Sequence, residues 1–302
     1  MSRILVTGRD GQVGFELIRS LSGKGQVIAV GREQMDLSRP DAIRRVVREI
    51  SPDLIVNTAA YTAVDQAESE PELAMAVNGV APGILGEESK RLGAALIHFS
   101  TDYVFDGSKT EPYAEDDAPC PINVYGRTKL AGERAIQAVD VPHLILRTSW
   151  VYGMRGKNFL LTILRLAQER DELRIVDDQI GAPTWSRALA EATQGILARL
   201  GYGKPGFIED CAEHGGVYHL SAAGQTTWHG FAAAILEQAA SKEIGLIDRV
   251  PALRPISSEE YPVPARRPSY SVLGNAKLER AFGVAMPDWK DSLAECIRSG
   301  KR

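Results

Sequence analysis

A tyrosine and a lysine stand four residues apart, at Tyr125 and Lys129, in a segment with helical patterning (VYGRTKLAGERAI). On a helix this spacing places both side chains on one face, where they can share a ligand. Hydride addition to a ketone builds negative charge on its oxygen, and a tyrosine hydroxyl can donate the neutralising proton. A nearby ammonium lowers the pKa of a phenol from its usual value of about 10. We therefore expect Lys129 to bring the pKa of Tyr125 toward neutrality.

A third polar side chain, Thr101, directly follows the apolar run Ala95 to Ser100 (ALIHFS). In open α/β sheets, ligands bind at the carboxyl ends of the strands. We expect the Thr101 hydroxyl to donate to the ketone oxygen and Lys129 to hold the nicotinamide ribose as well. Taken alone, a Tyr–Lys pair is more often a packed aromatic beside a solvated lysine. The catalytic interpretation therefore depends on a cofactor site elsewhere in the chain.

Three glycines, Gly8, Gly11 and Gly14, follow the first apolar run and precede a helical pattern (FELIRSL). Glycines allow a sharp turn and a close approach of the backbone to a pyrophosphate, and a helix N-terminus offers free N–H groups. Their spacing, Gly-x-x-Gly-x-x-Gly, differs from the Gly-x-Gly-x-x-Gly fingerprint, and glycine triplets also occur in ordinary turns. The preceding strand pattern and the following helix pattern favour a dinucleotide site.

Arg32 follows the second apolar run, close to where the adenosine ribose lies in such a fold. An arginine there accommodates the 2′-phosphate of NADP, whereas an acidic residue takes the ribose hydroxyls of NAD. The sequence thus favours NADPH. NADH remains the alternative, because Glu33 or Asp36 could bind its ribose hydroxyls. Without a cofactor role, Arg32 would be an ordinary solvated arginine at a strand end.

The elements that must position these residues alternate between strands and helices along the first half of the chain. Expected strands cover Arg3 to Thr7, Gln26 to Gly31, Leu54 to Asn57, Ala95 to Ser100 and Leu144 to Thr148. Expected helices cover Gln12 to Leu21, Arg39 to Ile50 behind a capping box of Ser38 and Asp41, and Leu73 to Leu92 up to Gly93. Such alternation indicates an α/β fold, a Rossmann-like doubly wound parallel sheet.

After Trp150 the alternation fades, and we expect a smaller C-terminal substrate-binding portion. Helical patterns are expected at Phe159 to Arg170, Ser186 to Leu200, Trp228 to Ala240, Asn275 to Phe282 and Trp289 to Ile297, with a strand at Gly216 to Ser221 and a long loop at Pro251 to Pro268. We assign residues 1–150 to a dinucleotide-binding domain. Residues 151–302 are assigned mainly to substrate binding, with some segments returning to the first domain.

The composition limits the kinds of partner that the chain is expected to bind. The 35 basic and 39 acidic residues give a net charge of −4, which argues against general nucleic-acid binding. Three cysteines, Cys120, Cys211 and Cys296, are far apart and fit unpaired thiols in a reducing compartment. No apolar run is long enough for a membrane span, and the N-terminus enters a strand pattern rather than a secretory signal. A cytoplasmic protein without nucleic-acid or membrane partners is expected.

Six strings resemble the dTDP-4-dehydrorhamnose reductase family of the extended short-chain dehydrogenase/reductase superfamily, and the similarity spans nearly the whole chain. They are Asn57 to Glu68 (NTAAYTAVDQAE), Ser100 to Phe105 (STDYVF), Asn123 to Glu133 (NVYGRTKLAGE), Arg147 to Gly153 (RTSWVYG), Asp178 to Thr184 (DQIGAPT) and Ala265 to Pro268 (ARRP). The resemblance implies NADPH- or NADH-dependent reduction of the C4 ketone of dTDP-4-dehydro-L-rhamnose to dTDP-L-rhamnose.

The resemblance also implies site residues. Catalysis is expected from Thr101, Tyr125 and Lys129. Cofactor contacts are expected from Gly8, Gly11, Gln12, Val13, Gly14, Arg32, Asp36, Leu37, Ala59, Ala60, Tyr61, Tyr125 and Lys129. Substrate contacts are expected from Thr101, Asp102, Tyr103, Trp150, Asn158, Arg266 and Arg267, the arginines because they bind phosphate bidentately.

Some members of the family use Mg²⁺ at a dimer contact, with a glutamate at the position of Glu16. A single carboxylate is a poor Mg²⁺ site, and hydride transfer needs no metal, so we expect no catalytic metal. The expected partner is a small-molecule nucleotide sugar, and the chain is expected to be a monomer or a homodimer.

Two alternatives keep the fold and change the activity. One is a non-catalytic, NADP-binding regulatory subunit, against which the Thr101, Tyr125 and Lys129 set argues. The other is a nucleotide-sugar epimerase or dehydratase. Dehydratases of this group carry an Asp-Glu pair beside the catalytic threonine, whereas here Asp102 is followed by Tyr103.

Overall fold

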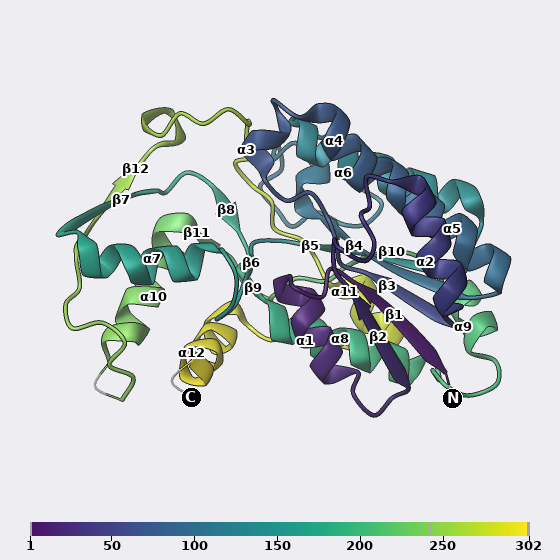
Figure 1. The fold of residues 1–302 in the computed structure, drawn as a ribbon. Coiled ribbons are helices and arrows are strands. Elements are labelled where there is room, and N and C mark those ends of the chain that lie inside the picture. Colours follow the sequence, from purple (N-terminus) through teal and green to yellow (C-terminus); the bar gives the residue numbers. More distant parts are fainter. Residues whose placement is uncertain (1, 242, 301–302) are drawn as a thin grey trace.

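A six-stranded parallel sheet with helices on both faces organises the molecule (Figure 1), in a computed structural model that describes residues 2–241 and 243–300. The strand order is β10-β5-β4-β3-β1-β2. The strands are β1 (Arg3–Thr7), β2 (Gln26–Val30), β3 (Leu54–Asn57), β4 (Ala95–Thr101), β5 (His143–Thr148) and β10 (Gly216–His219). The predicted α/β doubly wound architecture is confirmed.

The central strands are apolar on both sides because helices cover both faces of the sheet. In β1, Ile4 and Val6 join the core on one face, whereas Leu5 joins the core on the other, and all three are fully buried. Successive side chains of a strand point to opposite faces, so an unbroken apolar run fills two cores. Because the strands run parallel, their carboxyl ends all lie at one edge of the sheet.

Two groups of helices pack on the two faces. One face carries α1 (Gln12–Ser20), α8 (Ser186–Arg199), α9 (Phe207–Glu213) and α11 (Ala276–Phe282). The other carries α2 (Pro40–Ile50), α5 (Ala81–Leu92) and α6 (Val124–Val139). Before α5 come α3 (Val64–Ala67), α4 (Pro71–Met75) and the π-helical turn η1 (Ala76–Val80). Since α8, α9, α11 and β10 come from beyond residue 150, the later half of the chain returns to the sheet.

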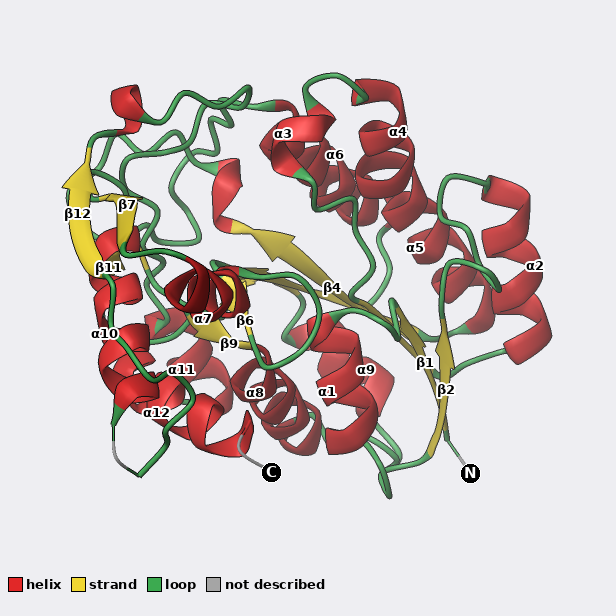
Figure 2. Cartoon of the chain, turned by 60° about the vertical axis from the view of Figure 1, so that its left-hand side comes forward, coloured by secondary structure: helices red, strands yellow, loops and turns green. Residues whose placement is uncertain are grey.

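The remaining elements lie beside the carboxyl edge of the sheet (Figure 2). They include three small strand pairs and the flanking helices α7 (Phe159–Glu169), α10 (Trp228–Ala240) and α12 (Trp289–Gly300). The pairs are β6 (Val151–Tyr152) with β9 (Thr184–Trp185), β7 (Glu172–Val176) with β12 (Ala252–Ile256), and β8 (Ile180–Gly181) with β11 (Thr226–Thr227). Short 3₁₀ turns are η2 (Asp102–Val104) and η3 (Ser258–Glu260).

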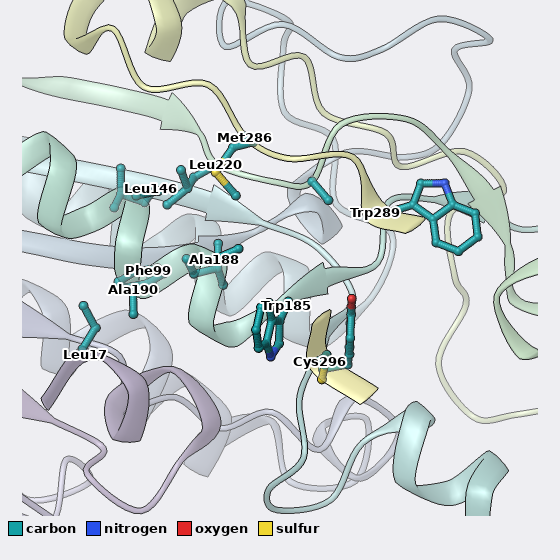
Figure 3. Close-up of a cluster of buried hydrophobic side chains, with 14 of the residues drawn as sticks. Leu17, Phe99, Leu146, Trp185, Ala188, Ala190, Leu220, Met286, Trp289 and Cys296 are labelled. Carbon is teal, nitrogen blue, oxygen red and sulfur yellow. The ribbon is translucent and has the colours of Figure 1, made fainter. Parts of the chain in front are cut away.

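One apolar core is continuous between the sheet and these flanking elements (Figure 3). It includes Leu17 of α1, Leu146 of β5, Trp185 of β9 and Trp289 of α12, each no more than 5% exposed. A shared core of this kind resists relative movement of the parts that it joins. The flanking elements are therefore held in a fixed position against the carboxyl edge of the sheet.

Two local predictions are wrong, and a third, the helix that ends at Leu92, is confirmed with an earlier start and a π-helical turn. No side chain caps α2, which begins behind Arg39, because the Ser38 hydroxyl donates to Asp36 instead (2.7 Å). The helix expected from Leu73 begins at Pro71 and widens into η1 before Pro82, which has no N–H for the carbonyl of residue 78. The expected loop from Pro251 contains β12, which pairs in parallel with β7.

Glu88 of α5 joins α2 to α5 as the centre of an ion cluster. Its side chain is 2% exposed and accepts hydrogen bonds from Arg44 (3.2 Å), Arg48 (2.6 and 2.8 Å) and Arg91 (2.9 Å). The hydrogen bonds from Arg48 are the largest cause that lowers the pKa of Glu88, from 4.5 to about 2, while burial opposes the shift. A carboxyl with a depressed pKa stabilises the fold above the unfolded-state pKa and loses this contribution as the pH falls.

We expect Glu88→Gln to lower the free energy of unfolding by roughly 2 kcal/mol at pH 7, because one shielded carboxylate loses three cationic partners. Denaturant titrations should show the difference from wild type shrinking as the pH falls from 4.5 toward about 2. Glu49→Gln is the matched control, since Glu49 is 60% exposed and pairs with Arg45 of its own helix. Equal effects of the two substitutions, or a pH-independent difference, would contradict this account.

Candidate functional site

The glycine loop after β1 turns so tightly that two of its glycines have no room for a side chain. Gly8 has a φ of +69°, and a Cβ there would lie 2.9 Å from the Thr58 Oγ1. A Cβ at Gly14 would overlap the Gly8 carbonyl oxygen. The Gly11 N–H donates to that same oxygen (2.9 Å). No glycine side chain therefore covers the backbone at the N-terminus of α1, as binding of a diphosphate requires.

All thirteen residues predicted to contact the cofactor line one cavity of about 600 Å³ at the carboxyl edge of the sheet. The glycine loop contributes Gly8, Gly11, Gln12, Val13 and Gly14; the end of β2 contributes Arg32, Asp36 and Leu37; the end of β3 contributes Ala59, Ala60 and Tyr61; and α6 contributes Tyr125 and Lys129. The chemically reactive pair and the glycine loop thus share one cavity. We call it the cofactor cavity.

Arg32 and Asp36 lie together in the wall of the cofactor cavity formed after β2. The Arg32 guanidinium is 78% exposed and stands 3.7 Å from an Asp36 carboxylate oxygen. The other Asp36 oxygen accepts hydrogen bonds from the Ser38 N–H (2.9 Å) and hydroxyl (2.7 Å). Asp36 is therefore held in place, whereas Arg32 is weakly paired and free to contact an anion.

The start of α6 is fixed by its capping residue, Asn123. Its side-chain oxygen accepts from the Gly126 N–H (2.8 Å), and its amide donates to the Arg266 carbonyl (2.8 Å). A Cβ at Gly126 would overlap the carbonyl oxygen of Tyr103, so α6 packs directly on the backbone after β4. The Tyr125 and Tyr103 rings consequently meet edge to face, with centroids 5.7 Å apart.

The expectation that Lys129 lowers the pKa of Tyr125 is wrong in this structure. Burial raises the pKa of Tyr125 to about 12; a hydrogen bond with Thr101 opposes this rise and the charge of Asp102 adds to it. Lys129 is not among the groups that shift this pKa, and its ammonium nitrogen donates to the Phe99 carbonyl instead (2.6 Å). The Tyr125 phenol is accordingly protonated at neutral pH.

Lys129 is itself 2% exposed, and burial lowers its pKa from 10.5 to about 8, while the negative charge of Glu133 acts in the opposite direction. A lysine in this state can exchange a proton near neutral pH. Its nitrogen lies 3.2 Å from His98 Nε2, and its side chain lines the cofactor cavity.

Thr101 ends β4 and is 5% exposed, but it does not line the cofactor cavity. Its hydroxyl donates to the Asp102 carboxylate (2.9 Å) and accepts from the Tyr103 N–H (3.1 Å). The expected donation of this proton to a ketone oxygen therefore competes with an internal acceptor. Asp102 is 2% exposed, and burial raises its pKa from 3.8 to about 6 although hydrogen bonds oppose the rise.

A second cavity, of about 1000 Å³, lies between α7, β7, β12 and the chain from Ser258 to Arg267. It contains both predicted arginines, Arg266 and Arg267, and Arg267 pairs with Asp65 of α3 (2.7 Å). Burial raises the pKa of Tyr103, which the charge of Arg267 acts to lower. Tyr103 itself lines neither cavity, but its ring meets that of Tyr125, which lines the cofactor cavity.

Trp150 and Asn158 line neither cavity. The Trp150 ring stacks on Trp228, with centroids 3.6 Å apart, and Trp228 does line the second cavity. Asn158 caps α7 by accepting from the Leu161 N–H (3.0 Å), and its amide donates to Gln12 (2.8 Å). Because this side chain is fully used, we do not retain it as a diphosphate ligand.

Among the lining residues that the sequence did not predict are two polar side chains, Lys157 and Gln179. Lys157 lines the cofactor cavity from the segment before α7, which lies against the glycine loop through the Gln12–Asn158 hydrogen bond. Gln179 lines the second cavity and bonds both Ser258 (2.8 Å) and Trp228 (3.2 Å). Lys157 carried no signal, whereas Gln179 lies inside the string DQIGAPT.

Glu16 of α1 is engaged by two arginines, Arg19 and Arg187, each 3.5 Å from the same carboxylate oxygen. Among residues 2–241 and 243–300, no group of three or more His, Cys, Asp or Glu side chains is arranged to hold a metal ion. In the same described residues, no helix is both long and apolar enough to cross a membrane.

We expect Asp102→Asn to raise the free energy of unfolding at pH 8 by roughly 1–2 kcal/mol, because it removes a buried charge. A carboxyl with a raised pKa stabilises the fold below the unfolded-state pKa and loses this contribution as the pH rises, here from 3.8 through about 6. Wild type and variant should converge below pH 4 in denaturant titrations.

Asp106→Asn is the matched control, since hydrogen bonds from Ser108 lower the pKa of Asp106. That variant should be less stable than wild type at pH 8. An Asp102→Asn protein whose stability parallels wild type at every pH would refute the buried-charge assignment.

Comparisons with known proteins point to one family. The profile of the family described as "RmlD substrate binding domain" matches residues 1–301. The dTDP-4-dehydrorhamnose reductase of Burkholderia thailandensis is 49% identical over 296 residues, covering 98% of both chains. The crystal structure of the Bacillus anthracis dTDP-4-dehydrorhamnose reductase in complex with NADP is 34% identical, with a TM-score of 0.88 over 99% of this chain and 100% of that one.

A Thermus thermophilus UDP-glucose 4-epimerase in complex with NAD aligns over 99% of both chains with a TM-score of 0.79, at 20% identity. At this identity the likeness concerns the fold alone.

Proposed function

Because the chain belongs to the RmlD substrate binding domain family, we propose that it is a reductase that converts the C4 ketone of dTDP-4-dehydro-L-rhamnose to the alcohol of dTDP-L-rhamnose with NADPH or NADH. The observation that carries this proposal is the single cavity lined by both the glycine loop and the Tyr125–Lys129 pair. A similarity in name alone would leave the chemistry open, whereas this geometry supplies a proton donor beside a dinucleotide site.

The cofactor cavity fits a nicotinamide dinucleotide. Gly8 and Gly14 leave bare backbone at the N-terminus of α1, where the diphosphate would bind. Arg32 would contact a 2′-phosphate, and Asp36 the ribose hydroxyls of a cofactor without one. Lys157, opposite the glycine loop, would add a cation to the diphosphate site. The reduced nicotinamide, when bound, supplies the hydride.

The remaining chemistry falls to this chain. Its neutral phenol makes Tyr125 the proton donor to the ketone oxygen, since burial keeps the hydroxyl protonated. Lys129 lines the cofactor cavity and would hold the nicotinamide ribose, while the Phe99 carbonyl fixes its nitrogen. Thr101 positions the Tyr125 hydroxyl, and its own hydroxyl donates a hydrogen bond to Asp102.

We assign the second cavity to the nucleotide sugar. Arg266 and Arg267 would bind its diphosphate, and Tyr103 would stand between this group and the reacting carbon. Trp150 supports the Trp228 ring in the wall of the cavity. In this proposal residues 1–150 bind the cofactor, and residues 151–302 mainly bind substrate, apart from β10, α8, α9 and α11, which complete the first domain.

A dehydratase of this group needs an Asp-Glu pair beside the threonine for water elimination, and here only the aspartate, Asp102, is present. The side chain that follows Asp102 is Tyr103, and burial holds its phenol protonated. The reductase is therefore the better fit to these residues. A protein that binds NADPH and never oxidises it in the presence of the keto sugar would instead be the non-catalytic relative.

We expect Tyr125→Phe to lower kcat by roughly 10²–10⁴-fold, the range for loss of a general acid, with the Kd for NADPH changed less than about twofold. The assay follows loss of reduced-nicotinamide absorbance with dTDP-4-dehydro-L-rhamnose, and NADPH binding is titrated by its fluorescence. Tyr202→Phe, a tyrosine outside both cavities, is the control and should keep wild-type turnover. Substantial activity in Tyr125→Phe would exclude the phenol as proton donor.

We expect Arg32→Ala to raise the KM for NADPH about tenfold or more while the KM for NADH changes little, because a charge-assisted bond to the 2′-phosphate is lost. Arg45→Ala, which removes another exposed arginine outside both cavities, should leave both values unchanged. Parallel increases for both nicotinamides in Arg32→Ala would withdraw the 2′-phosphate assignment.

A further inference from the structure

A buried row of polar side chains runs from Lys129 across β4 and β3 to Thr7 of β1, and its two end residues both line the cofactor cavity. The Lys129 nitrogen lies 3.2 Å from His98 Nε2, His98 Nδ1 lies 2.9 Å from the Asn57 amide, and Asn57 Oδ1 lies 2.6 Å from the Thr7 hydroxyl. Thr7, Asn57 and His98 are opposite one another on β1, β3 and β4. Each of these four residues is no more than 2% exposed, so the hydrogen bonds between their side chains are shielded from water.

The backbone sets the direction of every hydrogen bond in this row. The Thr7 hydroxyl oxygen accepts from the N–H groups of Thr58 and Ala59, each at 3.2 Å. Its own proton is therefore directed to Asn57 Oδ1. Asn57 then presents its amide nitrogen, which can only donate, to His98 Nδ1. His98 Nδ1 must accept this bond, so it carries no proton.

A histidine with an accepting Nδ1 has its single proton on Nε2. Burial lowers the pKa of His98 well below its usual value, with the charge of Lys129 acting in the same direction, so the ring is neutral. Its Nε2–H therefore points at the Lys129 nitrogen. An ammonium there would place two donors face to face, whereas a neutral amine would accept the bond.

We propose that His98 is a positioning residue for the reduction, whose Nε2–H, fixed through Asn57 and Thr7, favours the neutral amine of Lys129 over its ammonium. The role rests on the proposed function, since it concerns the lysine of that site. Phe99 holds the same nitrogen through its carbonyl (2.6 Å), so Lys129 can change its charge without leaving its place in the wall of the cofactor cavity. Burial lowers the pKa of Lys129 in the same direction.

Other charged groups near Lys129 are already engaged. Glu133, one helical turn along α6, raises the pKa of Lys129, but its carboxylate is bound by Arg147 of β5 (2.6 and 3.0 Å) and Ser100 of β4 (2.5 Å). Asp102 of η2 accepts from Thr101. From α3, Asp65 pairs with Arg267. His98 is thus the titratable side chain in direct contact with the lysine nitrogen.

The experiment reverses the hydrogen bonds made by His98 without substituting His98 or Lys129. In Asn57→Asp, a carboxylate accepts from both Thr7 and His98, which moves the histidine proton to Nδ1 and turns Nε2 into an acceptor for the ammonium. We expect the pKa of Lys129 to rise by about one unit or more, and the pH profile of kcat/KM to move with it. Lysine-selective NMR titration reports the pKa, and ¹⁵N-histidine NMR reports the tautomer.

The tautomer of His98 in the wild-type protein tests the proposal even where Asn57→Asp fails to fold. The five histidines of the wild type give few signals, and His98→Gln identifies the one that disappears. An Nε2–H tautomer is expected, and an Nδ1–H tautomer would overturn the proposal. Asn78→Asp, with an equally buried carboxylate outside the row, controls for charge alone; a pKa rise for Lys129 equal to that in Asn57→Asp would also overturn it.

The tautomer and the lysine titration do not depend on turnover. A wild type with the expected tautomer and no turnover would reject the proposed function alone. Full turnover with the opposite tautomer would reject the role of His98 alone.

Discussion

The close approach of α6 to the backbone of Tyr103 is the contact on which the rest of the site depends. Gly126 permits it because any side chain would overlap the Tyr103 carbonyl. Asn123 then fixes the helix start from two sides, through Gly126 and the Arg266 carbonyl. This single packing contact brings the Tyr125 ring to the end of β4 and links it to the loop that carries the arginines of the second cavity. A side chain at residue 126 would push the start of α6 outward and separate the Tyr125 ring from the end of β4 and from the loop of the arginines.

Near this contact several titratable side chains are buried, where the charged form of each is disfavoured. Burial raises the pKa values of Tyr125 and Asp102 and lowers those of Lys129 and His98, so each group is shifted toward its neutral form. Such groups destabilise a fold unless apolar packing elsewhere offsets them. The core shared by the sheet, α8 and α12 provides this compensation and keeps the site rigid. Burial, rather than an adjacent charge, is thus the largest influence on the protonation states of these four groups.

The sequence was informative where a pattern is local. The strands and the glycine loop could be predicted because their signals are contiguous, and position relative to the strands correctly linked Tyr125 and Lys129 to the loop, since carboxyl ends of parallel strands meet at one edge. Lys157 could not be found, because its place in the cavity depends on a contact between Asn158 and Gln12 that spans 146 residues of chain. The pKa of Tyr125 was misjudged because spacing on a helix does not reveal that Lys129 turns toward the Phe99 carbonyl. Tertiary contacts decide both.

The central claim is that the glycine loop and Tyr125 serve one hydride transfer to the ketone carbon of a nucleotide sugar. Transfer of an isotopic label tests it most directly, with NADPH deuterated at the transferred position and dTDP-4-dehydro-L-rhamnose as acceptor. The account predicts one deuterium at C4 of the sugar for each nicotinamide oxidised, with the nicotinamide released into solution. A sugar product without deuterium, or no net oxidation of the nicotinamide by the folded protein, would contradict it.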